Sequence, residues 1–464
     1  MSASRFLIDN PYTGELVADR PYATRGEAFS ALDRASRAQA KWAKTPLSER
    51  IALCERFCGE LDRKRDLIAR EVTAQMGKPL SQAKGEVNTA LARARHLMSI
   101  AADALAEEPL PAQPSTLRFV RHEPVGVVLD IAVWNYPLLI VVNVVIPAVL
   151  AGNAVLIKHA PRTALTAEAF ARAFAESDAP LDLVQALHAD HLTCAELIAR
   201  PEIGFVSFTG SARGGREVAR EAAKRLVSVG LALGGKTPVY IAADANLEHA
   251  IVNVVDGAMY NAGQSCSGVE RIYVHASHYD AFVEGALAET KKLLLGDPLR
   301  PQTSMGPMAQ PDAPRQLAAV IEEARAKGGR ILCGGRAASD DGRGRFFEPT
   351  LVAEATHAMR GLMVDEAFGP VVGIAKVMDD DDAVRVMNDS SYGLSAAIWT
   401  GDQARAFHLA GQLEAGTVFM NRCDHLDPAL PWSGVKESGT GVLLSRYGFQ
   451  SVTRRKSFNF RTQT

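Results

Sequence analysis

Apolar residues in the first hundred positions recur at the spacing of helical turns, with small polar and charged residues between them. The pattern predicts three amphipathic helices, over residues 24–43, 47–76 and about 85–106. Prolines between positions 109 and 114 then end the helical pattern, and residues 116–123 alternate as a half-exposed strand does. We interpret this strand as an arm that leaves the globular body.

From residue 127 onward, short apolar strands alternate with helical segments. Strand patterns cover residues 127–133, 154–158, 184–188 and 203–208, and helical patterns cover residues 140–150, 164–176 and 216–224. Alternation of this kind is typical of β-α-β units in a doubly wound parallel sheet, so we predict an α/β fold.

A second α/β stretch begins near residue 238. It carries helical patterns at residues 249–260 and 279–294, with a strand at 271–274. Residues 297–348 are rich in Gly, Pro and Asp, and they predict surface loops around a single helix at 311–327. Residues 456–461 alternate again and predict a second arm that pairs with the first. Two such arms favour assembly of several chains.

The stretch 131–157 contains no charged residue and is long enough for a membrane helix. It also contains asparagines and the prolines Pro137 and Pro147, which would leave polar groups and broken backbone hydrogen bonds unsatisfied in lipid. We therefore predict a buried strand, turn, helix and second strand here, and no membrane partner.

Composition narrows the functional classes. The chain has 464 residues, of which 47% are hydrophobic and 22% charged, with a formal net charge of −2. This is the mix of a globular protein of roughly two to three domains at about 150 residues each. The near-zero charge argues against a nucleic acid partner and favours a small molecule. Six cysteines are too few for a disulfide scaffold, and the first residues carry no secretory apolar run, so we expect a cytoplasmic protein.

The strand at 203–208 runs into a glycine-rich turn, TGSARGG, that contains Gly210 and Ser211 and precedes a helix. Free amide groups and the positive end of a helix dipole are what a pyrophosphate needs. The alternative interpretation is a serine N-cap followed by flexible glycines.

Cys266 is a lone thiol among small polar residues in YNAGQSCSG, straight after a helical segment. A thiol there can be exposed and its thiolate stabilised, as a nucleophile requires, whereas the alternative is a buried apolar cysteine. We assign the other cysteines to structural or indifferent positions. Cys54 and Cys58 share a helix face without a histidine, so we predict no metal site.

Asn135 in WNYP follows a buried strand, at the carboxyl end where open α/β sheets place ligands. Its amide can donate to a developing oxyanion. The alternative is an asparagine that only forms the turn before a proline-initiated helix.

Several segments stand in order along the chain: EPVGVVLDIAVWNYP, AGNAVLIKHAPRT, FVSFTGSARGG, GLALGGKTP, YNAGQSCSG, DEAFGPVV and PWSGVKESG. Together they resemble the aldehyde dehydrogenase superfamily over almost the whole chain. The resemblance implies a Rossmann-type cofactor domain (residues 1–112 and 126–235) and an α/β catalytic domain (236–445). It also implies a small β bridging domain built from oligomerisation arms (113–125 and 446–464), in a homodimer or homotetramer.

The resemblance implies a role for each matching position. Cys266 would be the nucleophile, and Asn135 with the Cys266 N–H would form the oxyanion hole. NAD or NADP would be bound by Trp134, Lys158, Gly210, Ser211, Leu233, Glu366 and Phe368. The implied reaction is aldehyde oxidation through a Cys266 thiohemiacetal and a thioester, which water finally cleaves.

One position departs from the family pattern in the catalytic machinery. The general-base glutamate falls on Ala232 in GLALGGK, and a methyl group cannot take a proton from water. We expect impaired or rerouted deacylation in a hydrolytic enzyme whose base has been altered, naturally or by engineering. The alternatives are a coenzyme A-acylating dehydrogenase and a catalytically inactive nucleotide-binding homologue.

A second departure concerns the cofactor. The family often has a glutamate three residues after the lysine, where this chain has Pro161 followed by Arg162. Charge therefore does not exclude NADP: Arg162 either pairs with a phosphate or is solvated at a helix start.

The resemblance also places a set of residues near the substrate entrance: Tyr136, Asn143, Tyr260, Leu426 and Trp432. Aromatic rings there favour an apolar aldehyde, and the alternative is that these rings belong to the core. Asp424, His425 and Asp427 in the same late loop would instead select a polar substrate.

Overall fold

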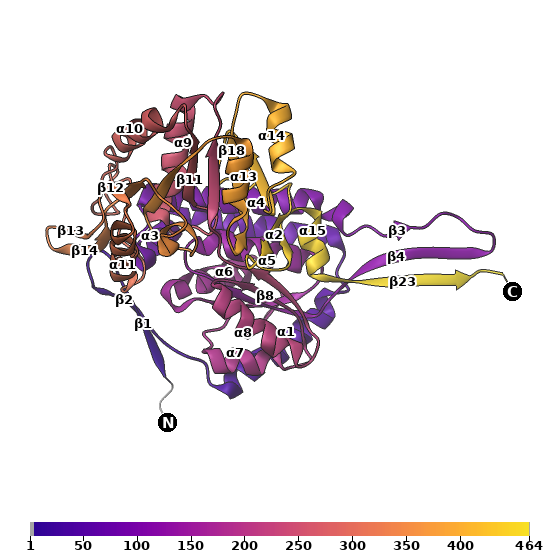
Figure 1. Ribbon diagram of the computed structural model, residues 1–464. Coiled ribbons are helices and arrows are strands. Elements are labelled where there is room, and N and C mark those ends of the chain that lie inside the picture. Colours follow the sequence, from indigo (N-terminus) through magenta and orange to yellow (C-terminus); the bar gives the residue numbers. More distant parts are fainter. Residues whose placement is uncertain (1–3, 464) are drawn as a thin grey trace.

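Two open sheets and one small projecting sheet organise the chain (Figure 1). The computed structural model describes residues 4–463. The first sheet is parallel, with the order β7-β6-β5-β8-β9, and its strands are β5 (Val127–Ala132), β6 (Ala154–His159), β7 (Val184–Ala186), β8 (Ile203–Thr209) and β9 (Ser228–Ala232). The chain winds outward in one direction from β5 and in the other from β8, as in a dinucleotide-binding sheet.

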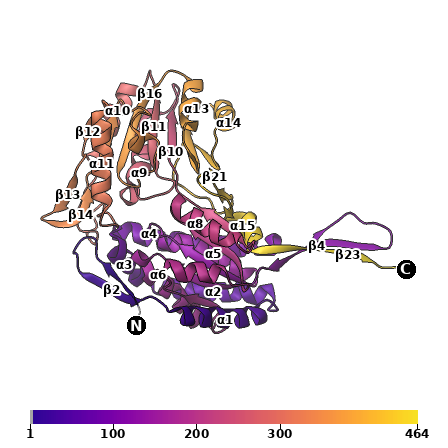
Figure 2. The same cartoon turned by 60° about the horizontal axis from the view of Figure 1, so that its bottom comes forward.

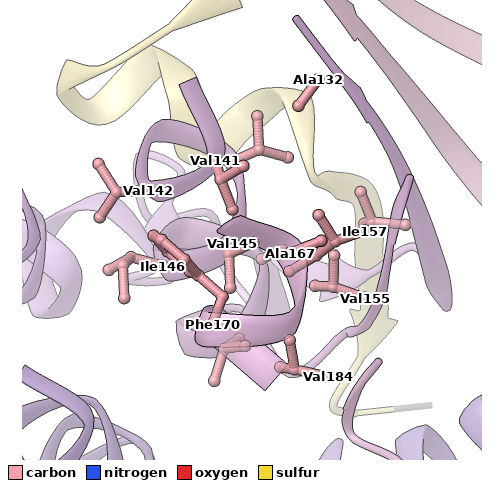
Figure 3. Packing of buried hydrophobic residues seen from close by; sticks show 14 of the residues in the cluster. Ala132, Val141, Val142, Val145, Ile146, Val155, Ile157, Ala167, Phe170 and Val184 are labelled. Carbon is pink, nitrogen blue, oxygen red and sulfur yellow. The ribbon is translucent and has the colours of Figure 1, made fainter. Parts of the chain in front are cut away.

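Helices α5 (Pro137–Leu150) and α6 (Ala164–Glu176) pack on this sheet. Every residue of β5 and β6 is buried, as expected for parallel strands covered on both faces. Figure 3 shows Val145 of α5 gathered with Phe170 of α6 and Val155 of β6. The uncharged stretch is thus a buried strand, helix and strand, as predicted. Among residues 4–463, no helix combines the length and apolar character needed to cross a bilayer.

The N-terminal helices lie beside the same sheet, and their bounds are α1 (Arg25–Trp42), α2 (Leu47–Arg63), α3 (Arg65–Met76) and α4 (Leu80–Ala104). The prediction of one helix over 47–76 is wrong, because Lys64 has φ −103° and ψ 13° and separates α2 from α3. Leu61 and Ile68, on either side of the break, are both buried. The apolar spacing therefore continues across the break and hides it.

The second sheet has seven strands in the order β12-β15-β16-β11-β10-β18-β19, parallel except for β12. These are β10 (Thr237–Ile241), β11 (Val269–His275), β12 (Arg330–Cys333), β15 (Thr350–Ala353), β16 (Val371–Val377), β18 (Ser395–Trp399) and β19 (Thr417–Met420). Its helices include α9 (Leu247–Met259), α10 (Tyr279–Thr290), α11 (Ala313–Ala326), α13 (Asp380–Asn388) and α14 (Gln403–Ala410). Figure 2 shows this layer facing the layer that contains α1–α6.

The segment 297–348, predicted as loops around one helix, also contains strands. Besides α11, it holds β12 and a hairpin of β13 (Ala337–Asp340) and β14 (Arg343–Phe347). The loop prediction is wrong because these strands are too short for alternation to show, and glycines with positive φ, such as Gly334 and Gly342, separate them. A second hairpin, β1 (Arg5–Asp9) with β2 (Leu16–Pro21), was not predicted.

The two arms pair as predicted. Strand β4 (Thr116–Pro124) runs antiparallel to β23 (Thr453–Arg461), and β3 (Glu108–Pro109) adds a third strand. The rings of Phe119 and Phe458 stack with centroids 4.5 Å apart. Helix α15 (Ser445–Ser451) leads into β23 and contacts α4 and α5, while the strands project away from the body (Figure 1).

Candidate active site

A cavity of about 350 Å³ draws its wall from both sheet layers, and many of the predicted site residues line it. Those on its wall are Cys266, Asn135, Ala232, Leu233, Tyr136, Asn143, Tyr260, Leu426 and Trp432. The predicted nucleophile, oxyanion donor and entrance residues therefore meet at one place, although they come from segments far apart in the sequence. The rings predicted as entrance residues contact the cavity rather than the core alone.

A tight turn carries Cys266 to the cavity. Asn261, Ala262 and Gly263, which follow α9, all have positive φ, at 55°, 55° and 66°. Gly263 is required there, because an added Cβ would lie 2.2 Å from the Gly369 carbonyl oxygen. Cys266 itself is partly exposed, so the alternative of a fully buried apolar cysteine does not hold.

The Cys266 thiol is not a stabilised thiolate. Burial raises its pKa to about 12, and the nearby carboxylates Asp424 and Glu366 raise it further. Burial and these carboxylates thus oppose the stabilised thiolate that we predicted, and the positive charge of Arg93, which interacts with the thiol, does not offset them. The thiol must lose its proton as it reacts.

Asn135 faces the nucleophile loop rather than merely forming a turn. Its side chain is buried, and Nδ2 donates to the Gln264 carbonyl oxygen at 3.0 Å. An amide nitrogen carries two hydrogens, so the second remains for a ligand in the cavity. The Asn135 carbonyl oxygen accepts from Asn261 Nδ2 and from Lys78 Nζ, each at 3.1 Å. These bonds join the Asn135 turn to the turn that carries Cys266.

A buried ion pair stabilises the turn that contains Asn135. Lys78 and Glu86 are both almost fully buried and form a salt bridge. Glu86 Oε1 also accepts from the Leu138 amide at 2.9 Å, in the first turn of α5. The Lys78 ammonium lies 4.1 Å from the centroid of the Tyr136 ring. The charge of Glu86 is thereby neutralised, and it holds the helix that follows Asn135.

The segment after β9 passes unusually close to the nucleophile. A Cβ on Gly235 would lie 2.2 Å from the Cys266 carbonyl oxygen, and one on Gly234 would lie 2.3 Å from the Glu366 carboxylate. Glycine is required at position 235, where the clash is with backbone, whereas at position 234 the end of the Glu366 side chain could shift. Ala232, at the end of β9, contributes a methyl group to the cavity wall.

Several predicted cofactor residues lie at the carboxyl edge of the five-stranded sheet. Lys158 lies in β6, Trp134 follows β5, and Gly210 follows β8, whose neighbours in the sheet are β5 and β9. The winding direction reverses between β5 and β8, which is where open sheets of this type bind dinucleotides. These residues thus lie at the edge where sheets of this topology bind dinucleotides.

Ser211 is the N-cap of α8 (Ala212–Ala223), and its Oγ accepts from the Gly214 amide at 3.2 Å. The capping interpretation is therefore confirmed. It leaves the other amides of the first turn, which have no intrahelical carbonyl, for an anion. An added Cβ at Gly210 would lie 2.8 Å from the Phe208 ring, so glycine lets the turn lie flat on that ring.

Glu270 organises the predicted nicotinamide end. It forms a buried salt bridge with Lys236, and its oxygens accept from the Ala367 amide at 2.9 Å and the Phe368 amide at 3.0 Å. The Phe368 ring meets the Trp134 ring edge to face, with centroids 5.5 Å apart. The two aromatic residues predicted beside the cofactor are thus in contact with each other.

Glu366 belongs to the same loop. Its Oε1 accepts from the Gly235 amide at 3.0 Å, and burial, followed by the charge of Glu270, raises its pKa to about 8. Trp134, Lys158, Gly210, Ser211, Glu366 and Phe368 are not among the residues that line the 350 Å³ cavity, whereas Leu233 is. The predicted cofactor residues other than Leu233 therefore lie outside this cavity.

Both interpretations of Arg162 are wrong. Its guanidinium donates to the Asp9 carbonyl oxygen at 2.6 Å and to the Gln75 carbonyl oxygen at 3.2 Å, and it forms a salt bridge with the Asp9 carboxylate. Arg345 pairs with the same carboxylate at 2.6 Å. Arg162 therefore fastens β1 to the body and is neither solvated nor available to a cofactor phosphate.

Sequence reasoning missed several residues on the cavity wall, among them Arg93 and Cys423. Arg93, on α4, is buried, and its only hydrogen bond within the described chain runs from Nη1 to Asn143 Oδ1 at 3.3 Å. Its Nε has no partner among those residues. Cys423, assigned to a structural or indifferent position, also lines the cavity, and its Sγ donates to the Asn253 carbonyl oxygen. No local pattern distinguishes Arg93 from the exposed charges of the same helix.

Comparison with known proteins matches this arrangement. The model of the aldehyde dehydrogenase family matches residues 1–458. The chain belongs to the aldehyde dehydrogenase family. Its relatives include succinate-semialdehyde dehydrogenase [NADP(+)] of Deinococcus radiodurans, 34% identical over 97% of this chain and 94% of the relative. A succinate semialdehyde dehydrogenase [NAD(P)+] of Escherichia coli is 33% identical over 96% of each chain.

Solved structures of aldehyde dehydrogenases share the fold. An NAD-dependent aldehyde dehydrogenase from Sinorhizobium meliloti superposes with a TM-score of 0.96 at 29% identity, covering 100% of this chain and 93% of that one. The predicted fold class is therefore confirmed. This aldehyde dehydrogenase is an NAD(P)-dependent oxidoreductase that acts on aldehydes.

Proposed function

We propose that this enzyme oxidises a short aldehyde that carries a remote carboxylate, of the succinate semialdehyde class, to the acid with NAD(P)+. The observation that carries this proposal is Arg93, whose buried guanidinium lies on the same cavity wall as Cys266. The names of the relatives from Deinococcus radiodurans and Escherichia coli support the same substrate class. This replaces our expectation of an apolar aldehyde.

Arg93 suits a carboxylate because its own hydrogen bonds are incomplete. One long bond to Asn143 leaves most of its five N–H donors to other partners, and a planar carboxylate can accept two of them at once. Burial lowers the pKa of Arg93 to about 10, so the guanidinium stays charged at neutral pH. A buried charge with spare donors favours an anionic ligand group.

The reaction begins at Cys266. Its sulfur bonds to the aldehyde carbon, its proton passes to water in the cavity, and the carbonyl oxygen becomes an oxyanion. Asn135 Nδ2 and the Cys266 N–H would hold that oxyanion, and the second Asn135 amide hydrogen on the cavity wall supports this role. A nicotinamide held at Trp134, Glu366 and Phe368 would supply the hydride acceptor for this carbon, and a thioester would then remain on Cys266.

Deacylation is the step that the sequence alters. A glutamate base at position 232 would stand on the cavity wall, where this chain has the Ala232 methyl group. We therefore propose that hydrolysis of the thioester is impaired or takes another route. The absence of a glutamate base at position 232 also favours coenzyme A as an alternative acceptor of the acyl group. An inactive homologue is disfavoured, since a dead site needs no thiol on its cavity wall.

We further propose the domain division suggested by the sequence, with residues 1–112 and 126–235 binding the cofactor and residues 236–445 completing the catalytic domain. Residues 113–125 and 446–464 would then join two or four copies of the chain. The projecting strands β4 and β23 support this, because Leu117 and Phe460 on them are exposed apolar side chains.

Rapid-mixing kinetics test the function. Succinate semialdehyde and butanal have equal chain length, so comparing them isolates the carboxylate. We expect a stoichiometric burst of NAD(P)H with both aldehydes, a lower KM for succinate semialdehyde, and free succinate as the quenched product. Cys266→Ala should remove the burst and keep cofactor binding. Absence of any burst in the parent enzyme would contradict the function, and a coenzyme A-dependent acyl product would establish the alternative acceptor.

A further inference from the structure

We propose that Asp424 is the base that activates water for hydrolysis of the Cys266 thioester. It would take the role of the family's glutamate base, whose position is occupied here by Ala232. This inference rests on the proposed aldehyde oxidation. It assigns to the site a catalytic carboxylate on the loop between β19 and the C-terminal strands.

The position of Asp424 relative to Cys266 is the main evidence. Asp424 Oδ1 accepts from the hydroxyls of Ser265, at 3.2 Å, and of Ser267, the two residues that flank the nucleophile. All four residues line the same cavity. Asp424 Oδ2 has no hydrogen-bond partner within residues 4–463, so it remains free to accept a proton from water. The serines therefore hold the carboxylate against the nucleophile loop, on the cavity wall that also carries Cys266, while one oxygen stays open.

The backbone also indicates that this placement is maintained against a conformational cost. Asp424 has φ 45°, in the left-handed region that non-glycine residues adopt rarely. Aspartate tolerates this region better than most residues, yet it persists only where the surrounding structure holds it. Here the hydrogen bonds to the serines beside Cys266 do so.

Other carboxylates fit the role less well. Glu86 lies on the wall but is neutralised by Lys78 and holds the first turn of α5. Glu366 is bonded to the Gly235 amide and does not line the cavity. Asp256 lines the cavity from the exposed side of α9 and has no hydrogen bond to the nucleophile loop within the described chain. Asp424 is the remaining carboxylate on that wall.

The surroundings give Asp424 the basicity of a proton acceptor. Burial raises its pKa above the usual value, Asp256 adds to the rise, and the two serine hydroxyls and Arg93 oppose it. Other titratable groups coupled to it are Lys78, Tyr136, Tyr260, Cys266 and Cys423. A raised pKa brings a carboxylate closer to neutral pH, where a general base is most effective.

The step balances without any further reactant. The water oxygen bonds to the thioester carbon while one water proton passes to Asp424 Oδ2, and the carbonyl oxygen becomes an oxyanion held by Asn135. The carbon–sulfur bond then breaks, and its electron pair leaves with the Cys266 thiolate. The product is the carboxylic acid, and the proton taken up by Asp424 passes to the Cys266 thiolate, which restores the thiol and the ionised carboxylate. No oxidation occurs here, because hydride has already left the carbon.

Asp424→Asn tests the proposal. The matched control is Asp427→Asn, because Asp427 is exposed on the same loop and, unlike Asp424, does not line the cavity, so the substrate-selecting role considered for it is not supported. We expect Asp424→Asn to keep the NAD(P)H burst and lose about 100-fold in steady-state turnover, within the usual range for a general base. The acyl group should then accumulate on Cys266, visible by mass spectrometry of the intact protein. Asp427→Asn should retain both phases.

Two rescues separate catalysis from a merely structural role. Hydroxylamine attacks thioesters directly, so it should restore turnover in Asp424→Asn. The double variant Ala232→Glu with Asp424→Asn should also recover turnover, because a carboxylate then stands at the family position. Loss of both burst and turnover without rescue would overturn the assignment, as would unchanged turnover in Asp424→Asn. Failure of the parent enzyme to give any burst would count instead against the proposed oxidation.

Ser267→Ala gives an independent measurement if Asp424→Asn does not fold. Removing one donor to Oδ1 destabilises the ionised carboxylate, so the pH at which steady-state turnover is half-maximal should rise, while burst amplitude stays constant. An unmoved pH profile would contradict the proposal.

Discussion

Arg93 on α4 donates from Nη1 to Oδ1 of Asn143 on α5, 3.3 Å away, and both side chains are buried. The bond joins a residue predicted at the substrate entrance to a guanidinium that no motif had indicated. The positive charge of Arg93 thus reaches the cavity wall from α4, a helix that packs against α5. The choice of substrate therefore depends on the packing of α4 against α5.

Arg93→Met should weaken selection for the carboxylate. A hydrogen bond to a charged group contributes about 1.5–3 kcal/mol, so KM for succinate semialdehyde should rise about 10- to 100-fold. KM for butanal, which has no carboxylate, should stay nearly constant. Arg95→Met on the exposed face of α4 is the control and should change neither value. Equal changes for the two aldehydes would contradict carboxylate recognition.

Gly235→Ala should slow acylation. Its new Cβ would lie 2.2 Å from the Cys266 carbonyl oxygen. Because that oxygen belongs to the backbone of the nucleophile, relieving the clash would displace Cys266. A misplacement of about 1 Å typically costs about 100-fold in rate, so the burst rate should fall by that order. Gly234→Ala meets only the end of the Glu366 side chain and should have a smaller effect on the burst. Stopped-flow absorbance of NAD(P)H distinguishes the two.

Replacing only one member of the Lys78–Glu86 ion pair should lower the free energy of unfolding strongly. Glu86→Gln or Lys78→Met each leaves a buried charge or donor without its partner, and we expect a loss of about 3–5 kcal/mol in the free energy of unfolding. The double variant Lys78→Met with Glu86→Leu should lose less, since no charge is stranded. Urea denaturation measures all three. A double variant as unstable as the sum of the singles would contradict this explanation.

Asp130 in β5 should make stability depend on pH. Burial raises its pKa well above the usual value, and the nearby Ser207 hydroxyl only partly opposes the rise. A raised folded-state pKa means that its contribution is fully present below the unfolded pKa, near 4, and is lost as pH rises. The loss is about 1.4 kcal/mol per pH unit until the folded-state pKa is reached.

Asp130→Asn cannot ionise and should escape that loss. The difference in free energy of unfolding between Asp130→Asn and the parent should therefore increase from pH 4 to pH 8, in favour of the variant. Thermal denaturation at several pH values measures it. A difference that does not change with pH would show that Asp130 titrates normally.

Much of the fold follows from local patterns in the sequence. The alternation of apolar strands and helices indicated both parallel layers, and the two alternating arms indicated the pairing of β4 with β23. The spacing of apolar residues along the chain is enough for this prediction. Strand and helix periodicity set which face of an element each side chain occupies, whatever that face later contacts. The same local reading failed at Lys64 and around Gly334, where the periodicity continues across a break or the strands are too short to display one.

The positions of Cys266 and Asn135 were also determined by the sequence, since each follows a recognisable element and ends at a turn. Their chemical state was decided by the tertiary structure. The raised pKa of the thiol, the spare donors of Arg93 and the hydrogen bonds from the serines to Asp424 arise between segments separated by many residues. The burial of a side chain and the charges around it depend on which distant segments pack against it. The residues next to it in the chain do not specify those contacts.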